Sequence, residues 1–306
     1  MSSDSRDDPR AYDVIVIGGG PAGLSAALVL GRCRRRVLVC DTGRPRNAPS
    51  HAAHGFYTRD GTPPEQLREI ALEQLRPYDV EVRLEFVTEA RQMSGGFEVR
   101  ASQRTFRARK LLLATGMRDR EPAVAGVREL TGTGVYHCPY CDGWDVRDQR
   151  LGTYAPGRDG AECALGLLTW SSRVTLFSDG PAPLERAQRD QLARHDIAVH
   201  EERVAALQRE GETLTGVRLE SGLIVPLDAL FVHAGMEQRS ALARSLGCEF
   251  EPGGAVRVAS GQTTSCPGLF VAGDAAGNVQ SIATAVAEGY VAATSINREL
   301  RQEDHP

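Results

Sequence analysis

Two cysteines separated by two residues are the part of this chain best suited to chemistry. They lie in the run Cys138-Pro139-Tyr140-Cys141-Asp142-Gly143. Two thiols at this spacing can close into a disulfide across one tight turn and reopen, which makes them a two-electron switch. A Cys-x-x-Cys setting also lowers the pKa of one thiol, and the thiolate is the reactive form. Asp142 stands where it can exchange protons with the thiols, although an Asp-Gly pair is also a common turn.

The other cysteines give the pair no partners. A structural zinc site needs four ligands, whereas no second cysteine pair follows and His137 is too close in sequence to chelate well. We therefore expect no metal. The remaining cysteines are expected to be small buried hydrophobic residues; they are Cys33, Cys40, Cys163, Cys248 and Cys266.

Length and composition predict a globular protein of two domains. The chain has 306 residues, of which 25% are charged, and a net charge of −4. That balance indicates neither a nucleic-acid partner nor an anionic membrane surface, and no apolar run is long enough to span a bilayer. Residues 1–10 are polar and lack the apolar centre of a secretory signal. We expect them to form a disordered tail on a cytoplasmic protein.

A glycine-rich loop near the N-terminus predicts a dinucleotide site. Residues 12–17 form a β-branched apolar run, typical of a buried parallel strand, and lead into Gly18-Gly19-Gly20-Pro21-Ala22-Gly23. The pattern G-x-G-x-x-G falls on Gly18, Gly20 and Gly23, which permit a tight turn, close approach of a pyrophosphate and close packing of helix on strand. A second strand ends at Asp41, about where a ribose-binding acid belongs.

Two further segments complete this half of the protein. Residues 109–116 predict a buried strand that ends in Ala114-Thr115-Gly116, and residues 267–274 predict another that ends in Gly273-Asp274. An acid at that position can accept hydrogen bonds from the hydroxyls of a polyol. Residues 282–300 predict a long Ala-rich helix. The N-terminal and C-terminal segments are therefore expected to form one domain, with a second domain inserted between them.

Taken together, these motifs resemble the low-molecular-weight thioredoxin reductase family. The resemblance rests on the first glycine loop, Ala114-Thr115-Gly116, the Cys138–Gly143 run and residues 264–274, in that order and spacing. It implies an α/β fold of two Rossmann-like, three-layer domains, one inserted in the other. An FAD-binding domain would comprise residues 11–118 and 236–306, and an NAD(P)-binding-like domain carrying the cysteines would comprise residues 119–235.

The resemblance also implies roles for single residues. FAD would lie on the first glycine loop, with Pro21 and Ala22 beside the glycines, and Asp274 would hold its ribityl chain. Cys141 would face the flavin, Cys138 would attack the substrate disulfide, and Asp142 would give and take protons. The family's Arg-Gln-Ala motif appears here as Val279-Gln280-Ser281, so the arginine is missing. A homodimer acting on a small-protein or small-molecule dithiol or disulfide is expected.

The second nucleotide loop departs from the family. It reads Ala155-Pro156-Gly157 where relatives have three glycines, and Pro156 removes one N–H donor from the phosphate cradle. After the next strand, Ser178-Asp179-Gly180 replaces the His-Arg-Arg that binds the 2′-phosphate of NADPH. Asp179 would repel that phosphate, yet it could accept the ribose hydroxyl of NADH. Three interpretations stay open: NADPH, NADH, or no nicotinamide at all.

Other functions are compatible with the same motifs. Two groups that resemble thioredoxin reductase lack the nucleotide site: oxygen-dependent dithiol oxidases of natural-product pathways, and enzymes that take electrons from ferredoxin. A non-catalytic flavoprotein that senses redox state is a further alternative. His51 and His54 follow Asp41, and either could act as a base, because imidazole titrates near neutral pH; the alternative is that both are ordinary loop histidines.

Overall fold

The computed structural model describes residues 11–102, 104–157, 159–277 and 279–306, so the expected tail lies outside the described residues. The chain divides into two compact units. Unit 1 is drawn from Met1–Ala48 (described from residue 11), Phe56–Arg118 and Met236–Pro306. Unit 2 comprises Asp119–Gly235 together with Pro49–Gly55. The short segment 49–55 therefore packs with unit 2, although its neighbours in sequence belong to unit 1.

The sheet of unit 1 is built on buried parallel strands. Its order is β3-β2-β1-β6-β5-β4, and β17 also pairs with β6. Strands β3, β2, β1, β6 and β17 run parallel, whereas β4 and β5 form antiparallel pairs beside β6. The bounds are β1 Ala11–Ile17, β2 Val37–Asp41, β3 Val80–Leu84, β4 Val87–Met93, β5 Gly96–Ala101, β6 Arg104–Leu113 and β17 Leu269–Val271. Val14, Ile15 and Val16 are fully buried, as a central strand requires.

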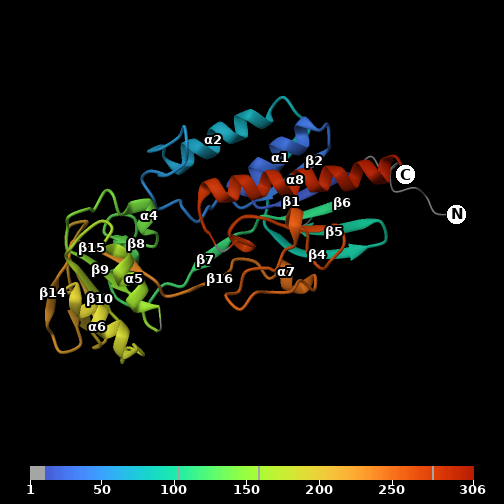
Figure 1. The fold of residues 1–306 in the computed structure, drawn as a ribbon. Helices are drawn as coiled ribbons and strands as arrows, with labels where there is room; N and C mark the ends of the chain where they lie inside the picture. Colours follow the sequence, from blue (N-terminus) through green and yellow to red (C-terminus); the bar gives the residue numbers. More distant parts are fainter. Residues whose placement is uncertain (1–10, 103, 158, 278) are drawn as a thin grey trace. The chain divides into compact units, whose positions relative to one another are not determined.

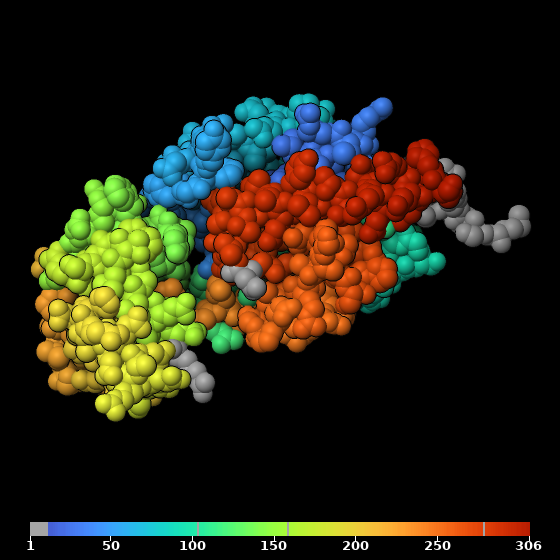
Figure 2. Space-filling model, viewed as in Figure 1, coloured from blue at the N-terminus to red at the C-terminus, as the bar shows by residue number. Residues whose placement is uncertain are grey.

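Helices cover one face of this sheet (Figure 1). They are α1 Pro21–Arg32, α2 Pro64–Leu75 and α8 Ile282–Asp304, and their apolar residues form one core with Val14 and Val16. The opposite face packs Ile15 and Ile17 against β4, β5 and the short α7, Leu242–Ser245. The C-terminal helix begins at the predicted residue and extends four residues past the predicted end at Leu300, and its outer side chains reach the surface (Figure 2).

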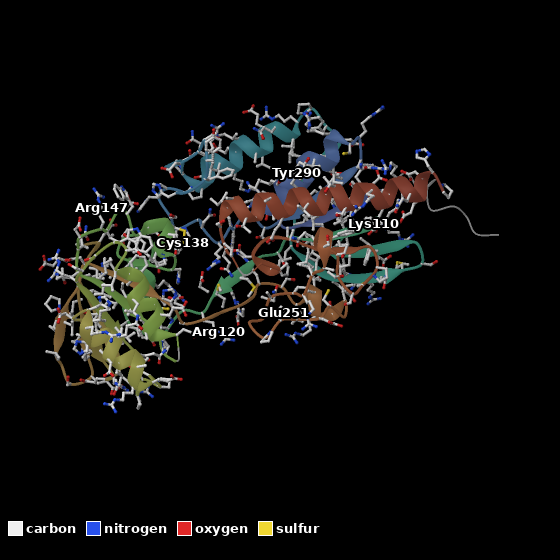
Figure 3. All side chains as sticks on the ribbon, viewed as in Figure 1. Lys110, Arg120, Cys138, Arg147, Glu251 and Tyr290 are labelled. Atoms are coloured by element: carbon white, nitrogen blue, oxygen red, sulfur yellow. A yellow bond between two sulfur atoms is a disulfide. The ribbon has the colours of Figure 1, made fainter. Side chains whose placement is uncertain are left out.

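The crossing of α1 and α8 depends on small residues. A Cβ added at Gly289 would lie far closer to the backbone carbonyl of Ala22 than real Cβ atoms come to another heavy atom. Beside this point the hydroxyl of Ser25 donates to the carbonyl of Val286 at 2.8 Å. At the other end of α8 the buried Lys110 binds Glu299 and Glu303, each at 2.7 Å (Figure 3). The first half of the helix is therefore fixed on α1 and its last turns on strand β6.

Unit 2 has a second parallel sheet, of order β11-β10-β9-β15-β8. One face is covered by α5 Gly160–Leu167 and α6 Arg186–Arg194, and the other by an antiparallel sheet of β12, β13 and β14. The remaining bounds are α3 Val127–Leu130, β8 Val135–Tyr136, α4 Pro139–Asp142, β9 Leu151–Tyr154, β10 Val174–Phe177, β11 Ala198–His200, β12 Val204–Glu210, β13 Thr213–Leu219, β14 Ile224–Pro226 and β15 Ala229–Val232. The predicted α/β class, with two Rossmann-like domains built on parallel sheets, is confirmed.

Two short strands carry the chain between the units. They are β7 Met117–Asp119 and β16 Met236–Gln238, which pair as a two-stranded sheet. Within the described residues, no helix is long and apolar enough to cross a membrane. Two expectations about the cysteines were wrong. Cys33 is exposed, because it follows the last residue of α1 and caps that helix at the surface, and Cys163 in α5 is only half-buried.

The close approach at Gly289 leads to a stability prediction. Gly289→Ala places a methyl group against the backbone of α1, which cannot move aside as a flexible side chain would, so we expect a loss of about 1–3 kcal/mol in the free energy of unfolding. Gly166→Ala is the matched control, because no described atom lies within 4 Å of the added Cβ in α5; there we expect a gain of about 0.5–1 kcal/mol. Calorimetric unfolding at equal flavin loading measures both, and equal stability of the two variants would contradict the prediction.

Candidate functional site

The parallel strands of unit 1 gather the predicted cofactor residues at one edge of the sheet. Strands β2, β1, β6 and β17 are parallel neighbours, so their carboxyl ends lie at the same edge. At these carboxyl ends lie Asp41, which ends β2, the Gly18–Gly23 loop, Ala114–Gly116 and Gly273–Asp274. Ligands of open α/β sheets bind at this edge. Motifs that are far apart in the sequence are therefore brought together without any special loop.

The glycine loop has the form of an anion cradle. Gly18 has a φ of 112°, and a Cβ there would collide with the backbone of Ala114, while a Cβ at Gly23 would collide with the carbonyl of Gly18. Gly20 differs, because its backbone is extended (φ −81°) and no described atom lies within 4 Å of its Cβ position. The chain's own packing does not require glycine at this position, but close approach of a phosphate at the start of α1 does.

Asp41 is held as a buried carboxylate. Its Oδ2 accepts a hydrogen bond from Nη2 of Arg68, in α2, at 2.8 Å, and a Cβ at Gly19 would lie 2.8 Å from the carboxylate. Burial alone would raise the pKa of Asp41, but hydrogen bonds from Arg68 and from the amides of Gly19 and Gly43 lower it below the ordinary value. Asp41 is therefore ionised at neutral pH and suited to accept ribose hydroxyls.

Asp274 has a basic partner that the sequence did not reveal. Nη1 of Arg46 lies 3.0 Å from Oδ2 of Asp274 and also donates to the side chain of Gln280. Arg46 stands 228 residues before Asp274, in the loop after β2, so no local motif marks it. Arg46 thus places a guanidinium beside Gln280. In the family motif Arg-Gln-Ala, the arginine directly precedes the matching glutamine. Ser281 caps α8 instead, accepting from the Thr284 amide at 3.0 Å.

A second acid lies beside Asp274. Oε2 of Glu288, in α8, accepts the amide of Gly273 at 2.7 Å. Burial raises the pKa of Glu288, and the charge on Asp274 raises it further. The residues present fit a flavin dinucleotide. The start of α1 at Gly20 suits its phosphates, and the carboxylates of Asp41 and Asp274 suit its hydroxyl groups. Among the described residues, no cluster of His, Cys, Asp or Glu could hold a metal ion.

The redox pair lies at the corresponding edge of unit 2. Cys138 follows β8 and caps α4, and it is joined to Cys141 by a disulfide with a Cα–Cα distance of 5.2 Å (Figure 3). The amides of Cys141 and Asp142 donate to the carbonyl of Cys138 at 3.0 and 3.1 Å. The single helical turn therefore sets the distance between the sulfur atoms. Both cysteines are half-buried, so a substrate can reach them.

Gly143 is needed for space rather than for a turn. Its φ of −62° is helical, whereas a Cβ at this position would lie 2.7 Å from the ring of Trp170. Trp170 packs beneath the cysteine turn and meets the exposed Tyr140 edge-on, with 5.4 Å between ring centroids.

Asp142 has the proton affinity of a neutral-pH acid and base. Burial, followed by the nearby charge of Asp145, raises the pKa of Asp142 to about 6, and His54 opposes the shift. Nε2 of His54 lies 3.4 Å from Oδ2 of Asp145. Of the two candidate histidines, His54 thus reaches the redox turn, whereas His51 is exposed.

The substituted nucleotide loop is engaged in contacts within unit 2. Oδ2 of Asp179 accepts the hydroxyl of Tyr154 at 2.6 Å, and its Oδ1 accepts the amide of Val204 at 2.8 Å. Tyr154 ends β9, is buried, and has its pKa raised by burial and by Asp179. Ala155 is buried and donates its amide to Phe177 at 3.0 Å. Both carboxylate oxygens of Asp179 therefore already have donors.

Comparisons with known proteins agree with the geometry. Residues 12–289 match the family described as pyridine nucleotide-disulphide oxidoreductase. The chain is 33% identical over 304 residues to the thioredoxin reductase tcpT of Claviceps purpurea, covering 94% of each, and 27% identical over 318 residues to the thioredoxin reductase of Listeria innocua, covering 96% of each. The crystal structure of HlmI superposes with a TM-score of 0.91 at 36% identity, covering 96% of this chain and 94% of that one.

These relatives do not favour the oxidase or sensor alternatives, since the curated ones carry the name thioredoxin reductase. The matched segment spans both units, from β1 into α8. The chain belongs to the pyridine nucleotide-disulphide oxidoreductase family, an enzyme class whose thioredoxin reductase-like branch uses FAD.

Proposed function

We propose that this enzyme relays two electrons between FAD bound at the edge of unit 1, the Cys138–Cys141 pair and a disulfide or dithiol substrate. The observation that carries the proposal is the closed disulfide on a one-turn helix beside a half-buried acid. Bound FAD supplies or accepts the two electrons. Gly18, Gly20 and Gly23 would hold its phosphates, Asp41 the ribose, and Asp274 with Arg46 and Gln280 the ribityl region.

The thiol steps balance without another reactant. In the dithiol form, the Cys138 thiolate attacks one sulfur of the substrate disulfide, a mixed disulfide forms, and one substrate thiolate leaves. The Cys141 thiolate then attacks the sulfur of Cys138, which closes the protein disulfide and releases the second substrate thiolate. Two electrons pass from the pair to the substrate. The same steps run backwards when the substrate is a dithiol.

Asp142 supplies the protons for these steps. A departing thiolate is a better leaving group when a proton is delivered, and an acid with a pKa near the working pH both gives and takes protons readily. Asp142 follows Cys141 directly, and its amide is bonded to the carbonyl of Cys138 at 3.1 Å. It is therefore tied to both cysteines by the same turn.

NADPH is proposed to be a poor electron donor. Asp179, whose oxygens bind Tyr154 and Val204, stands where the family places arginines, and Pro156 offers no amide to a phosphate. Glu201, just beyond β11, is already paired with Arg189 at 2.7 Å, so Asp179 is the acid that a phosphate would meet here. A 2′-phosphate would meet negative charge in place of bidentate donors. NADH or a direct thiol donor does not carry this penalty.

The substrate and setting are proposed from the relatives. Thioredoxin reductases act on the disulfide of a small protein, and the same exposed cysteine turn can meet a small-molecule disulfide. A homodimer in the cytoplasm is the corresponding expectation for assembly and location.

The role of Cys141 is tested by replacing its sulfur. Cys141→Ser should keep bound flavin yet lose thiol-driven flavin reduction by about 1000-fold or more, because no second sulfur can close the disulfide. The measurement is anaerobic bleaching of the flavin by dithiothreitol in a stopped-flow spectrometer. Cys163→Ser, a half-buried cysteine of the same unit, is the control. Flavin bleaching in Cys141→Ser at the wild-type rate would contradict electron transfer through the cysteine pair.

Asp142→Asn tests the buried acid through stability and pH. Since the folded pKa of Asp142 is raised to about 6, the protonated carboxyl stabilises the fold below about pH 4, and this contribution is lost as pH rises through about 6. The variant should therefore be more stable than wild type at pH 7.5, by about 1–2 kcal/mol after allowance for solvent, and should lose that advantage at pH 4. Turnover should fall by about 100-fold.

The control for this prediction is Asp148→Asn, an exposed acid nearby whose positive φ suits asparagine. Chemical denaturation at the two pH values measures the stability difference. An advantage of Asp142→Asn that is equal at both pH values would show that burial of its charge is not the cause.

The donor is tested by mixing the oxidised, FAD-loaded enzyme anaerobically with NADPH, NADH and dithiothreitol. Dithiothreitol shows that the flavin and cysteines are competent. NADPH should bleach the flavin at least about tenfold more slowly than NADH, or both should fail, because a lost charge-assisted contact costs about 1.5–3 kcal/mol. Rapid bleaching by NADPH would overturn the proposal for this site.

A further inference from the structure

A short loop, Pro49–Gly55, places the imidazole of His54 beside the turn that follows Cys141. Segment Pro49–Gly55 packs with unit 2 rather than with the residues on either side of it in sequence. The carbonyl of Pro49 lies where a Cβ of Gly132 would stand, so glycine there permits direct backbone contact. Ala53 is buried. His54 follows immediately, and its position is therefore set by the packing of this segment.

The imidazole of His54 lies beside the turn that follows Cys141 and contains Asp142 and Asp145. Nε2 of His54 lies 3.4 Å from Oδ2 of Asp145, and the two side chains are 30% and 56% exposed. Asp145 stands one turn after Asp142, and its amide donates to the Asp142 carbonyl at 3.1 Å. The groups facing Asp142 are thus Asp145 from its own turn, His54 from the loop, Tyr136 from β8 and the cysteine pair.

We propose that His54 and Asp145 are positioning residues that govern proton exchange at Asp142 and so set the pH range in which the cysteine pair reacts with its substrate. The inference rests on the proposed role of Asp142. It assigns a function to a loop that neither the cysteine motif nor the glycine motif includes.

The two residues act on Asp142 with opposite sign. A carboxylate at Asp145 disfavours a second negative charge at Asp142, whereas a protonated His54 favours it. Both effects act on the pKa of Asp142. Burial raises this pKa most, Asp145 raises it further, and His54 lowers it. A purely structural ion pair at this exposure would fix the loop and contribute about 0–1 kcal/mol to stability. Such a role would leave the pH dependence of the thiol reaction unchanged.

The experiment measures how fast the pre-reduced, FAD-loaded enzyme reacts with dipyridyl disulfide between about pH 4.5 and 9. A plot of this rate against pH has a midpoint on its acid side. His54→Gln should move that midpoint upward by about 0.5–1 pH unit, and Asp145→Asn should move it downward by a similar amount. The double variant should return close to wild type. Either single variant is informative if the other fails to fold.

The matched control is Arg128→Gln, which breaks another exposed ion pair of unit 2, at 2.9 Å from Glu121. It should leave the midpoint in place. Wild-type midpoints in both His54→Gln and Asp145→Asn would overturn the inference. Asp142→Asn separates the two levels of argument: an unchanged pH profile there contradicts the role of Asp142 itself, whereas a changed profile with unmoved midpoints in the other variants contradicts only His54 and Asp145.

Discussion

Backbone contact at glycine is the constraint on which unit 1 depends. At Gly18, Gly23 and Gly289 a Cβ would occupy the space of a neighbouring carbonyl, so β1, α1 and α8 come together at distances that only glycine permits. This contact closes the core around Val14 and Val16. It also brings the start of α1 to the edge where β6 and β17 end. Packing therefore requires glycine at Gly18, Gly23 and Gly289, whereas it does not require glycine at Gly20.

In unit 2 the governing quantity is charge rather than space. A carboxyl that is withdrawn from water beside a second acid resists ionisation, which destabilises the fold at neutral pH. Asp142 bears that cost next to the one disulfide among the described residues. A surface acid would carry no such cost, yet it would also be fully ionised and unable to deliver a proton to a leaving thiolate.

Local patterns predicted the parts of the structure that local physics determines. The β-branched run before Gly18, the start of α8 at Ile282 and the cysteine turn all follow from short-range sequence. The sequence did not predict the partners that approach from far along the chain. Arg46 reaches Asp274, His54 reaches Asp145, and Tyr154 reaches Asp179 only after the sheets have formed. Gly143 looked like a turn glycine, but its neighbour Trp170 explains it.

The layout of the second sheet keeps Asp179 and the cysteine turn on separate strands. The order β10-β9-β15-β8 places Asp179 after one strand and Cys138 after another, with two strands between them. Asp179 accepts hydrogen bonds from Tyr154 and Val204, neither of which belongs to the cysteine turn. The turn is instead fixed by Trp170 and by its own backbone. Asp179 and the cysteine turn therefore have separate supports, so a change in the contacts of one need not disturb the other.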